Sequence, residues 1–529
     1  MTSVKILVSD PLAKEGLDIL QGQGGFSVDV KPKLPPAELK KIIKDYDALV
    51  VRSGTKVTQD ILSAAKKLRI VGRAGVGIDN VDVAYASRLG VIVMNAPAGN
   101  TISTAEHTMS MILSMSRNIP AANQSMREGR WDRKKFMGTE LYNKTLGIIG
   151  MGRIGAEVAR RAISFKMKII SFDPYLSVDK ARKMDVEAVD LKTLLKNSDY
   201  VTVHTPLSPE TRHIISVAQF KMMKKGVRIV NCARGGIIDE KALYDALRSG
   251  KVAGAALDVY EKEPPADSPL IKRDDVVATP HLGASTEEAQ VNVAIDIAES
   301  VRDAMLDRGL RNAINVPSVD SETLKNLQPY LNLAEKIGLF QSNLAGGNIN
   351  KVKVKYIGDV TEYNVTPITM SVVKGLLDPM LRETITCMNA SLIAKSRGIE
   401  VTESKTSEIT DFANAIVVTV ESSKSKNLVM GSLFTKVDPR IIRINNFYVD
   451  LVPKGHLIYI SNKDVPGVVG SIGTLLGKNG INIAGMTFGR IKPGGNAITV
   501  LNIDGKPSPA VMEKLRRTKD IKDVKSMKL

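Results

Sequence analysis

Short apolar runs alternate with helix-period stretches over the first 98 residues of the chain. Runs of this length, bounded by polar turns, are typical of buried strands. The expected strands are Lys5–Val8, Ala48–Val51, Arg69–Gly72 and Val91–Met94. We therefore expect residues 1–98 to form a first α/β domain.

A second and longer series of the same kind follows a helix-period pattern over residues 101–118. Its expected strands are Thr145–Ile149, Met167–Phe172, Tyr200–Val203, Val227–Asn231, Gly254–Val259 and Val276–Thr279. Strands and helices that alternate at this spacing predict a parallel, doubly wound sheet, here over residues 99–293. The long helical pattern Glu287–Met305 is expected to return the chain to the first domain, which residues 294–316 complete.

The pattern changes after Pro317. Residues 317–450 are rich in Asn, Lys, Thr and Val, hold strand-like runs such as Lys351–Tyr356 and Ala415–Val420, and show no catalytic pattern. Residues 451–529 have the order βαββαβ, which is typical of a ferredoxin-like plait. Its expected elements are His456–Ile460, Gly467–Lys478, Asn482–Phe488, Asn496–Ile503, Pro509–Arg517 and Ile521–Ser526.

The composition is that of an ordinary soluble protein, with 43% hydrophobic and 25% charged residues among 529. This length is enough for three or four domains. Cys232 and Cys387 cannot form a disulfide framework or a four-cysteine metal site, which fits a reducing cytoplasm. Met1–Asp10 does not resemble a targeting leader, and no uncharged stretch is long enough to span a bilayer, so we expect no membrane partner.

The net charge of +18 raises the question of nucleic-acid binding. The lysines are scattered along the whole chain, with only short clusters such as Arg133–Lys135, and aromatic residues at 4% leave few surfaces for base stacking. We interpret the charge as a solvated basic surface or as attraction of small anionic substrates, and expect no nucleic-acid partner.

A glycine-rich turn, Gly150-Met-Gly-Arg-Ile-Gly155, follows the first strand of the second series and opens a helix. In this context Gly150 permits the turn, Gly152 lets the backbone approach a pyrophosphate, and Gly155 lets helix and strand pack closely. Asp173 ends the next strand, where a carboxylate binds ribose hydroxyls and repels a 2′-phosphate. The motif predicts NAD rather than NADP, although an aspartate before a proline can also simply cap a turn.

Polar residues stand at or just past the other strand ends of this series. The carboxyl ends of parallel strands meet at one edge of the sheet, so these side chains are expected to converge on one crevice. The six ends carry Gly150, Asp173, Thr205, Arg234, Asp258 and His281, and Glu263 lies in the loop after Asp258.

Hydride transfer from an alcohol requires a base for the hydroxyl proton and a cation for the neighbouring carboxylate. His281 suits the base, Glu263 can hydrogen-bond its second ring nitrogen, and Arg234 suits the carboxylate. Taken singly, each has a structural explanation, but their joint placement favours catalysis.

Other chemistry-bearing residues carry no such pattern. We interpret the remaining histidines as structural or peripheral: His107, His204, His213 and His456. No His or Cys spacing suggests a metal, so we expect none. Trp131, the one tryptophan, fits a subunit contact and core packing equally well.

Five strings resemble the motifs of the D-2-hydroxyacid dehydrogenase family, over residues 1–316: Gly72–Asn80, Gly150–Gly155, His204–Pro206, Asn231–Gly236 and Pro280–Ser285. The resemblance implies an NAD-dependent oxidoreductase acting on CH-OH groups, with Arg234, Glu263 and His281 as the catalytic set. Beside the three glycines, it implies NAD contacts at Arg153, Ile154, Asp173, Thr205, Cys232, Ala233, Arg234, Asp258, His281, Gly283 and Ala284.

Within this family the segments Val51–Val57, Trp131–Gly138 and His281–Ser285 are most similar to the long phosphoglycerate dehydrogenases, and Asn462–Gly467 with Gly480–Ile483 resembles an ACT effector loop. The implied fold is α/β, with two Rossmann-like doubly wound domains for substrate and NAD. An α+β intervening domain over 317–450 and a ferredoxin-like ACT domain over 451–529 follow.

The same resemblance implies that a homo-oligomer, dimer or tetramer, oxidises 3-phosphoglycerate to 3-phosphohydroxypyruvate in the first step of L-serine biosynthesis. Implied substrate contacts are Arg52, Ser53, Arg73, Gly75 and Asn100, with Arg133 and Lys134 reaching a neighbouring subunit's site. An L-serine effector is expected at Asp464 and Asn482.

Two other functions stay open on the sequence alone. One is another D-2-hydroxyacid dehydrogenase, such as a hydroxypyruvate or glyoxylate reductase, and the ACT-like tail argues against it. The other is a non-catalytic NAD-sensing regulator, against which the intact Arg234, Glu263 and His281 argue.

Overall fold

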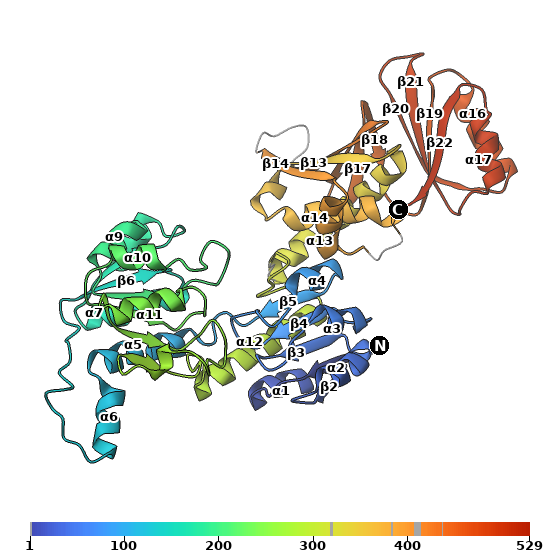
Figure 1. Ribbon diagram of the computed structural model, residues 1–529. Coiled ribbons are helices and arrows are strands. Elements are labelled where there is room, and N and C mark those ends of the chain that lie inside the picture. The colour runs from blue at the N-terminus through green and yellow to red at the C-terminus, as the bar shows by residue number, and fades with distance from the viewer. Residues whose placement is uncertain (1–2, 318–320, 382–384, 407–413, 436) are drawn as a thin grey trace.

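The computed structural model describes residues 3–317, 321–381, 385–406, 414–435 and 437–529, and it contains four β-sheets. In Figure 1 the first sheet (blue) and the second (green) lie next to each other and are bridged by α12 (Glu287–Met305), while the third and fourth (orange and red) extend from the first. Among the described residues, no helix combines the length and the apolarity needed to cross a bilayer.

The first sheet is parallel, with strand order β2-β1-β3-β4-β5. Its strands are β1 (Val4–Val8), β2 (Phe26–Val30), β3 (Ala48–Val51), β4 (Ile70–Arg73) and β5 (Ile92–Asn95), and its helices are α1 (Lys14–Gln21), α2 (Pro36–Ile42), α3 (Gln59–Ala64) and α4 (Val83–Arg88). The four strands predicted here are confirmed to within one residue. The strand β2 was missed, because it lies at the sheet edge and is mostly solvent-exposed, so its apolar pattern is weak.

The helix α12 packs against the first sheet, although it follows the second sheet in sequence. Ile297 and Val301 are fully buried there, against Gly72 of β4. Beyond the helix, Asn315 Oδ1 accepts a hydrogen bond from the Val93 backbone N–H at 2.9 Å. The chain segment after the second sheet is thus built into the first.

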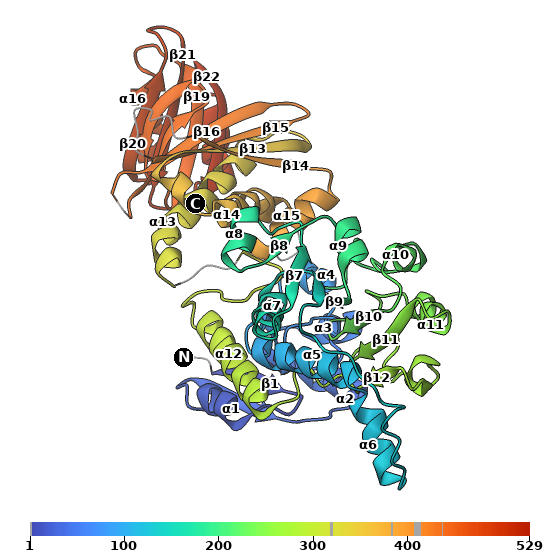
Figure 2. The same ribbon diagram turned by 90° about the vertical axis from the view of Figure 1, so that its left-hand side faces the viewer.

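The second sheet is also parallel, with strand order β12-β11-β10-β9-β6-β7-β8. Its strands are β6 (Thr145–Ile149), β7 (Lys168–Phe172), β8 (Glu187–Ala188), β9 (Tyr200–Val203), β10 (Val227–Asn231), β11 (Val252–Leu257) and β12 (Val276–Ala278). Its helices are α5 (Thr101–Ser116), α6 (Ile119–Arg127), α7 (Arg153–Ser164), α8 (Val178–Lys183), α9 (Leu191–Asn197), α10 (Val217–Met222) and α11 (Glu240–Arg248). The predicted doubly wound sheet is confirmed, and only the two-residue strand β8 was not foreseen. Figure 2 shows α6 projecting away from the body of the protein.

The third sheet is mixed, with order β14-β13-β15-β16-β17-β18. Its strands are β13 (Ile349–Gly358), β14 (Glu400–Thr406), β15 (Asn414–Ser422), β16 (Lys426–Leu433), β17 (Pro439–Ile444) and β18 (Phe447–Leu451). The accompanying helices are α13 (Ser321–Leu344), α14 (Thr366–Leu377) and α15 (Cys387–Ser396). The two strand-like runs predicted here lie inside β13 and β15, which confirms them.

The fourth sheet is antiparallel, with order β20-β21-β19-β22. Its elements follow the predicted βαββαβ order: β19 (His456–Lys463), α16 (Val468–Lys478), β20 (Ile483–Arg490), β21 (Asn496–Ile503), α17 (Pro509–Arg516) and β22 (Ile521–Lys528). Helices α16 and α17 share one core with it, while Tyr459 and Val500 belong to the core around α13. The third and fourth sheets therefore share a hydrophobic core.

Candidate active site

The glycine-rich turn joins β6 directly to α7. Gly150 has a φ of 95°, in the left-handed region that favours glycine. A Cβ at Gly155 would lie 2.2 Å from the Gly150 carbonyl oxygen, so a glycine is needed for α7 to start this close to the strand. At Gly152, the N-cap of α7, a Cβ would meet no atom within 4 Å, which leaves the backbone open to a ligand. This open helix N-terminus suits an anion such as a pyrophosphate.

Asp173 lies immediately after β7 and faces the turn. Its Oδ2 accepts a hydrogen bond from the Met151 backbone N–H at 2.7 Å, and its Oδ1 accepts one from the Tyr175 N–H at 2.8 Å. The carboxylate is therefore held beside the glycine-rich turn, in the position from which dinucleotide-binding folds contact a ribose.

A cavity of about 410 Å³ opens at the carboxyl ends of the second sheet. Asn100 Oδ1, His204 Nδ1 and Thr205 Oγ1 line it, and these buried atoms have no hydrogen-bond partner in the described part of the chain. Buried polar atoms are normally satisfied, so the cavity fits a ligand with polar groups, such as the nicotinamide end of NAD. Predicted NAD contacts that line it are Ile154, Thr205, Cys232, Ala233, Arg234, Asp258, His281, Gly283 and Ala284. The others, Gly150, Gly152, Arg153, Gly155 and Asp173, lie at the turn.

Two side chains of this cavity are neutral at physiological pH. Burial lowers the pKa of His204 to about 4, and its Nε2 lies 3.0 Å from Thr202 Oγ1. Burial, with a smaller effect from the Asp258 charge, raises the pKa of the Cys232 thiol to about 12. The cavity wall at these positions therefore offers polarity without charge.

Asp258 organises the loop that carries His281. Its carboxylate accepts hydrogen bonds from Thr279 Oγ1 at 2.6 Å and from the backbone N–H groups of Leu282 at 2.7 Å and Gly283 at 2.8 Å. Burial alone would raise the pKa of Asp258, but hydrogen bonds from His107 and these groups outweigh it and hold the pKa below its ordinary value. His107 Nε2 lies 3.2 Å from Asp258 Oδ1, a contact that no local sequence pattern indicates.

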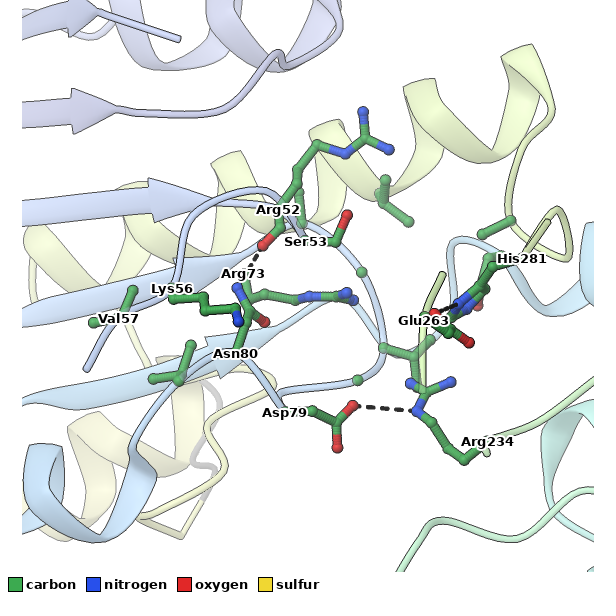
Figure 3. A pocket seen from close by; sticks show the side chains of 18 of the residues that line it. Arg52, Ser53, Lys56, Val57, Arg73, Asp79, Asn80, Arg234, Glu263 and His281 are labelled. Atoms are coloured by element: carbon green, nitrogen blue, oxygen red, sulfur yellow. Dashed lines mark hydrogen bonds and ion pairs between the residues drawn. The ribbon is translucent and has the colours of Figure 1, made fainter. Parts of the chain in front are cut away.

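A second cavity, of about 1000 Å³, lies between the first and second sheets (Figure 3). Predicted site residues from both sheets line it: Arg52, Ser53, Arg73, Gly75, Asn100, Arg234, Glu263 and His281. Sequence reasoning missed Lys56, Asp79, Asn80 and Gln290, which also line it. Asp79 and Asn80 stand within the Gly72–Asn80 motif and Lys56 within the Val51–Val57 segment, so their positions were the available sign, whereas Gln290 lies in neither.

Arg73 and Arg234 give this cavity a strongly positive wall. Burial, together with the nearby charge of Arg234, lowers the pKa of Arg73 to about 10, and the Arg73 Nε is buried without a partner in the described residues. Arg234 Nε donates to Asp79 Oδ2 at 3.3 Å, and this pair is visible in Figure 3. Two close guanidinium groups repel each other unless an anion lies between or beside them, so the cavity suits an anionic ligand.

Glu263 and His281, which both line the second cavity, form a hydrogen-bonded pair. The Nδ1 of His281 lies 2.9 Å from Glu263 Oε2, and Glu263 Oε1 accepts a hydrogen bond from the Tyr260 backbone N–H at 3.1 Å. His281 lines both the cavity of about 410 Å³, called the cofactor cavity below, and the cavity of about 1000 Å³ with Arg73 and Arg234, called the anion cavity. This arrangement leaves Nε2 as the ring nitrogen available for proton transfer.

Known proteins match nearly the whole chain over nearly their own full length. It is 45% identical to the D-3-phosphoglycerate dehydrogenase of Archaeoglobus fulgidus, over 99% of this chain and 100% of that protein. It is 47% identical to the D-3-phosphoglycerate dehydrogenase of Methanocaldococcus jannaschii, over 98% of this chain and 99% of that one. The chain belongs to the D-3-phosphoglycerate dehydrogenase family. Residues 109–283 match the NAD binding domain of the D-isomer specific 2-hydroxyacid dehydrogenases, residues 326–445 the D-3-phosphoglycerate dehydrogenase intervening domain, and residues 456–520 the ACT domain.

Solved structures resemble the catalytic part of this dehydrogenase. A glyoxylate reductase from Paecilomyes thermophila superposes with a TM-score of 0.56 at 31% identity, covering 59% of this chain and 99% of that one. D-lactate dehydrogenase from Aquifex aeolicus, solved with NAD and lactic acid, gives a TM-score of 0.53 at 28% identity, over 59% of this chain and 100% of that one. The first two sheets thus have the fold of 2-hydroxyacid dehydrogenases, and the NAD binding domain identifies NAD as the cofactor of this family member.

Arg133 and Lys134 do not line the anion cavity of this dehydrogenase chain. They lie in the exposed stretch after α6, close to Trp131 and Met137, whose side chains are 74% and 81% exposed. The structure therefore does not bring these two predicted substrate contacts to the site within one chain.

The predicted effector residues of the ACT domain already have partners. Asp464 Oδ2 accepts a hydrogen bond from Arg490 at 3.2 Å, and the Asn482 side-chain amide donates to Asp504 at 2.8 Å. An effector that binds these two residues has to displace or share those contacts. Arg490 is the residue near this loop that sequence reasoning missed.

Proposed function

We propose that the chain oxidises D-3-phosphoglycerate to 3-phosphohydroxypyruvate with NAD, the first step of L-serine biosynthesis. The observation that carries this proposal is the Glu263–His281 pair, whose imidazole lines both a cavity suited to nicotinamide and a cavity walled by Arg73 and Arg234. Similarity to D-3-phosphoglycerate dehydrogenases over nearly the full chain supports the choice of substrate.

In this reaction His281 Nε2 takes the proton of the substrate hydroxyl, because Nδ1 is engaged by Glu263. Glu263 stabilises the imidazolium that forms and fixes the ring orientation. Arg234 binds the substrate carboxylate through its planar guanidinium, while Arg52 and Arg73 supply positive charge for the phosphate. When bound, the nicotinamide ring of NAD accepts the hydride from the carbinol carbon.

The assay is NADH formation at 340 nm by the purified protein, with 3-phosphoglycerate, D-glycerate and D-lactate offered in parallel, each with NAD and with NADP. We expect turnover of 3-phosphoglycerate with NAD, because Asp173 faces the ribose position and the cavity is cationic. Preference for an unphosphorylated acid would contradict 3-phosphoglycerate as the substrate, and absence of turnover in both directions would favour an NAD-sensing regulator.

His281→Ala should lower kcat by about 10²-fold or more, the scale of lost acid–base catalysis.

We also propose that the protein is a homo-oligomer, a dimer or tetramer, in which α6 and the stretch after it contact a second subunit. Trp131 and Met137 expose large apolar side chains there, and Arg133 and Lys134 extend from the same stretch toward solvent. Exposed apolar residues grouped in this way are typical of an interface. Light scattering that finds a fully active monomer would contradict this.

Regulation by L-serine at Asp464 and Asn482 is a further part of the proposal. It rests on the match of residues 456–520 to the ACT domain. Addition of L-serine should inhibit the wild-type enzyme, and Asp464→Ala should weaken that inhibition while leaving basal turnover in place.

We place the enzyme in the cytoplasm, since Cys232 and Cys387 are both free thiols.

A further inference from the structure

The loop that carries Glu263 is tied to the start of α11 by a reciprocal pair of hydrogen bonds. The Glu261 backbone N–H donates to Glu240 Oε1 at 2.6 Å, and the Glu240 backbone N–H donates to Glu261 Oε1 at 3.3 Å. Each carboxylate thus holds the backbone of the other residue. His213 Nε2 lies 3.1 Å from the same Glu261 oxygen and adds a third side chain to the cluster.

The residues of this cluster come from three neighbouring loops at the carboxyl edge of the second sheet. His213 follows β9, Glu240 opens α11 after β10, and Glu261 follows β11, and these strands are adjacent in the sheet. The loops also touch through their backbones, because a Cβ at Gly235 would lie 1.8 Å from the Tyr260 carbonyl oxygen. The cluster therefore joins the loop of Arg234 to the loop of Glu263.

Glu263 depends on this turn for its orientation. In the described part of the chain its carboxylate accepts two hydrogen bonds, one from His281 Nδ1 and one from the backbone N–H of Tyr260. Its side chain is 40% exposed, so packing holds it weakly. The position of Tyr260 and Glu261 thus decides where the Glu263 carboxylate meets the imidazole.

The cluster is electrostatically unfavourable, which indicates that its geometry matters. Burial raises the pKa of Glu240, and the nearby Glu261 and Glu263 carboxylates add to this, while the hydrogen bond from the Glu261 backbone opposes it. A half-buried carboxylate beside two others costs stability unless donors compensate for it. The donors here are the backbone N–H groups of the turn and of the first turn of α11, whose positive end also favours an anion.

We propose that Glu240 is a positioning residue for the dehydrogenase reaction. It holds the Tyr260–Glu261 turn, the turn orients Glu263, and Glu263 orients His281. This inference rests on the proposed function, since it assigns Glu240 to the proton-transfer machinery of that reaction. Glu240 itself touches neither cavity, so its effect is on turnover rather than on binding.

The test compares Glu240→Ala, which removes the acceptor for the Glu261 N–H, with Glu240→Gln, which keeps a carbonyl oxygen there. We expect Glu240→Ala to lower kcat about 10-fold, because His281 is then less well oriented for proton transfer. The KM values for 3-phosphoglycerate and NAD should change by less than about two-fold, because Glu240 lines neither cavity. Glu240→Gln should stay within about two-fold of wild type. Glu38→Ala, which removes a carboxylate from the first turn of α2, is the matched control for helix-terminus effects.

A double-mutant cycle decides whether Glu240 acts through Glu263. In a Glu263→Ala background, adding Glu240→Ala should lower kcat by less than about two-fold further; a full additional 10-fold loss would overturn the proposal. A rise in KM without a fall in kcat would overturn it too. If Glu240→Ala does not fold, as judged by thermal melting, Glu240→Asp carries the same test, because its shorter side chain withdraws the acceptor from the Glu261 N–H and keeps the charge. An inactive wild-type enzyme would instead contradict the proposed function.

Discussion

At the residue scale, the anion cavity depends on glycines that leave room for guanidinium groups. A Cβ at Gly77 would lie 2.0 Å from Arg234 Nη2 and 2.9 Å from Asp79 Oδ2. At Gly75 a Cβ would lie 2.0 Å from Arg73 Nη1. Gly75 and Gly77 therefore let the loop after β4 pack directly against both guanidinium groups.

Gly77→Ala tests this arrangement. The added methyl has to push the flexible end of Arg234 out of place, so we expect the KM for 3-phosphoglycerate to rise about 10-fold, the size of one weakened charge-assisted contact, while NAD affinity is unchanged. Gly24→Ala is the control, because a Cβ there meets no atom within 4 Å. Steady-state kinetics and NAD titration measure the two quantities, and an unchanged KM would contradict the role of Gly77.

At the scale of the element, the parallel strands of the second sheet bury polar residues at the edge that forms the site. The strand β9 is buried throughout, and His204 follows it directly into the cofactor cavity. Burial in this position lowers its pKa to about 4, from an ordinary value of 6.5. The fold thus keeps this histidine neutral at a pH where an unfolded chain would protonate it.

This difference predicts a pH dependence of stability. Between about pH 6.5 and pH 4 the unfolded chain binds a proton at His204 and the folded chain does not, so the free energy of unfolding falls as the pH falls through this window. The loss approaches about 3 kcal/mol near pH 4 and then levels off. Urea denaturation at several pH values should show this slope in wild type and a flatter one in His204→Gln. Equal slopes in the two proteins would contradict the assignment.

At the scale of the whole molecule, the third and fourth sheets are one packed body, and it contacts the catalytic part at a defined place. The Phe340 and Tyr459 rings, from α13 and β19, meet edge to face with centroids 6.3 Å apart. The Lys525 ammonium of the fourth sheet donates to the Asn343 carbonyl at the end of α13 at 2.9 Å. Toward the catalytic part, the Asn389 amide of α15 donates to the Arg88 carbonyl of α4 at 3.2 Å.

Phe340→Ala should destabilise both of these sheets together. Phe340 is fully buried, so the truncation leaves a cavity and should cost about 3–5 kcal/mol. We expect calorimetry to show one transition for both sheets that moves to lower temperature, with the transition of the catalytic part unmoved. Phe434→Ala, at a 52% exposed position in the same body, should cost less than about 1 kcal/mol. Separate shifts of the two sheets would contradict a common core.

Local sequence determined most of the elements and the first half of the cofactor site. Buried strands are recognisable in the sequence as continuous apolar runs. The turn from β6 to α7 needs glycines because of its own backbone: Gly150 has a positive φ, and Gly155 lies close to the Gly150 carbonyl oxygen. In the first two sheets the missed strands are β2, an exposed edge, and β8, a two-residue strand, where burial leaves little pattern. In the third sheet only β13 and β15 were named in advance. The roles of Arg234, Glu263 and His281 were predicted from strand ends, and they stay predictions that kinetics must test.

Tertiary structure alone decided which loops meet. The Asp258–His107 contact, the Asp79–Arg234 pair and the Glu240–Glu261 exchange all join residues that lie far apart in sequence or in separate loops. No periodicity encodes such contacts, because they arise only when parallel strands place their carboxyl ends side by side. The same reason applies to the shared core around α13, since an apolar helix face in the sequence does not say which sheet covers it.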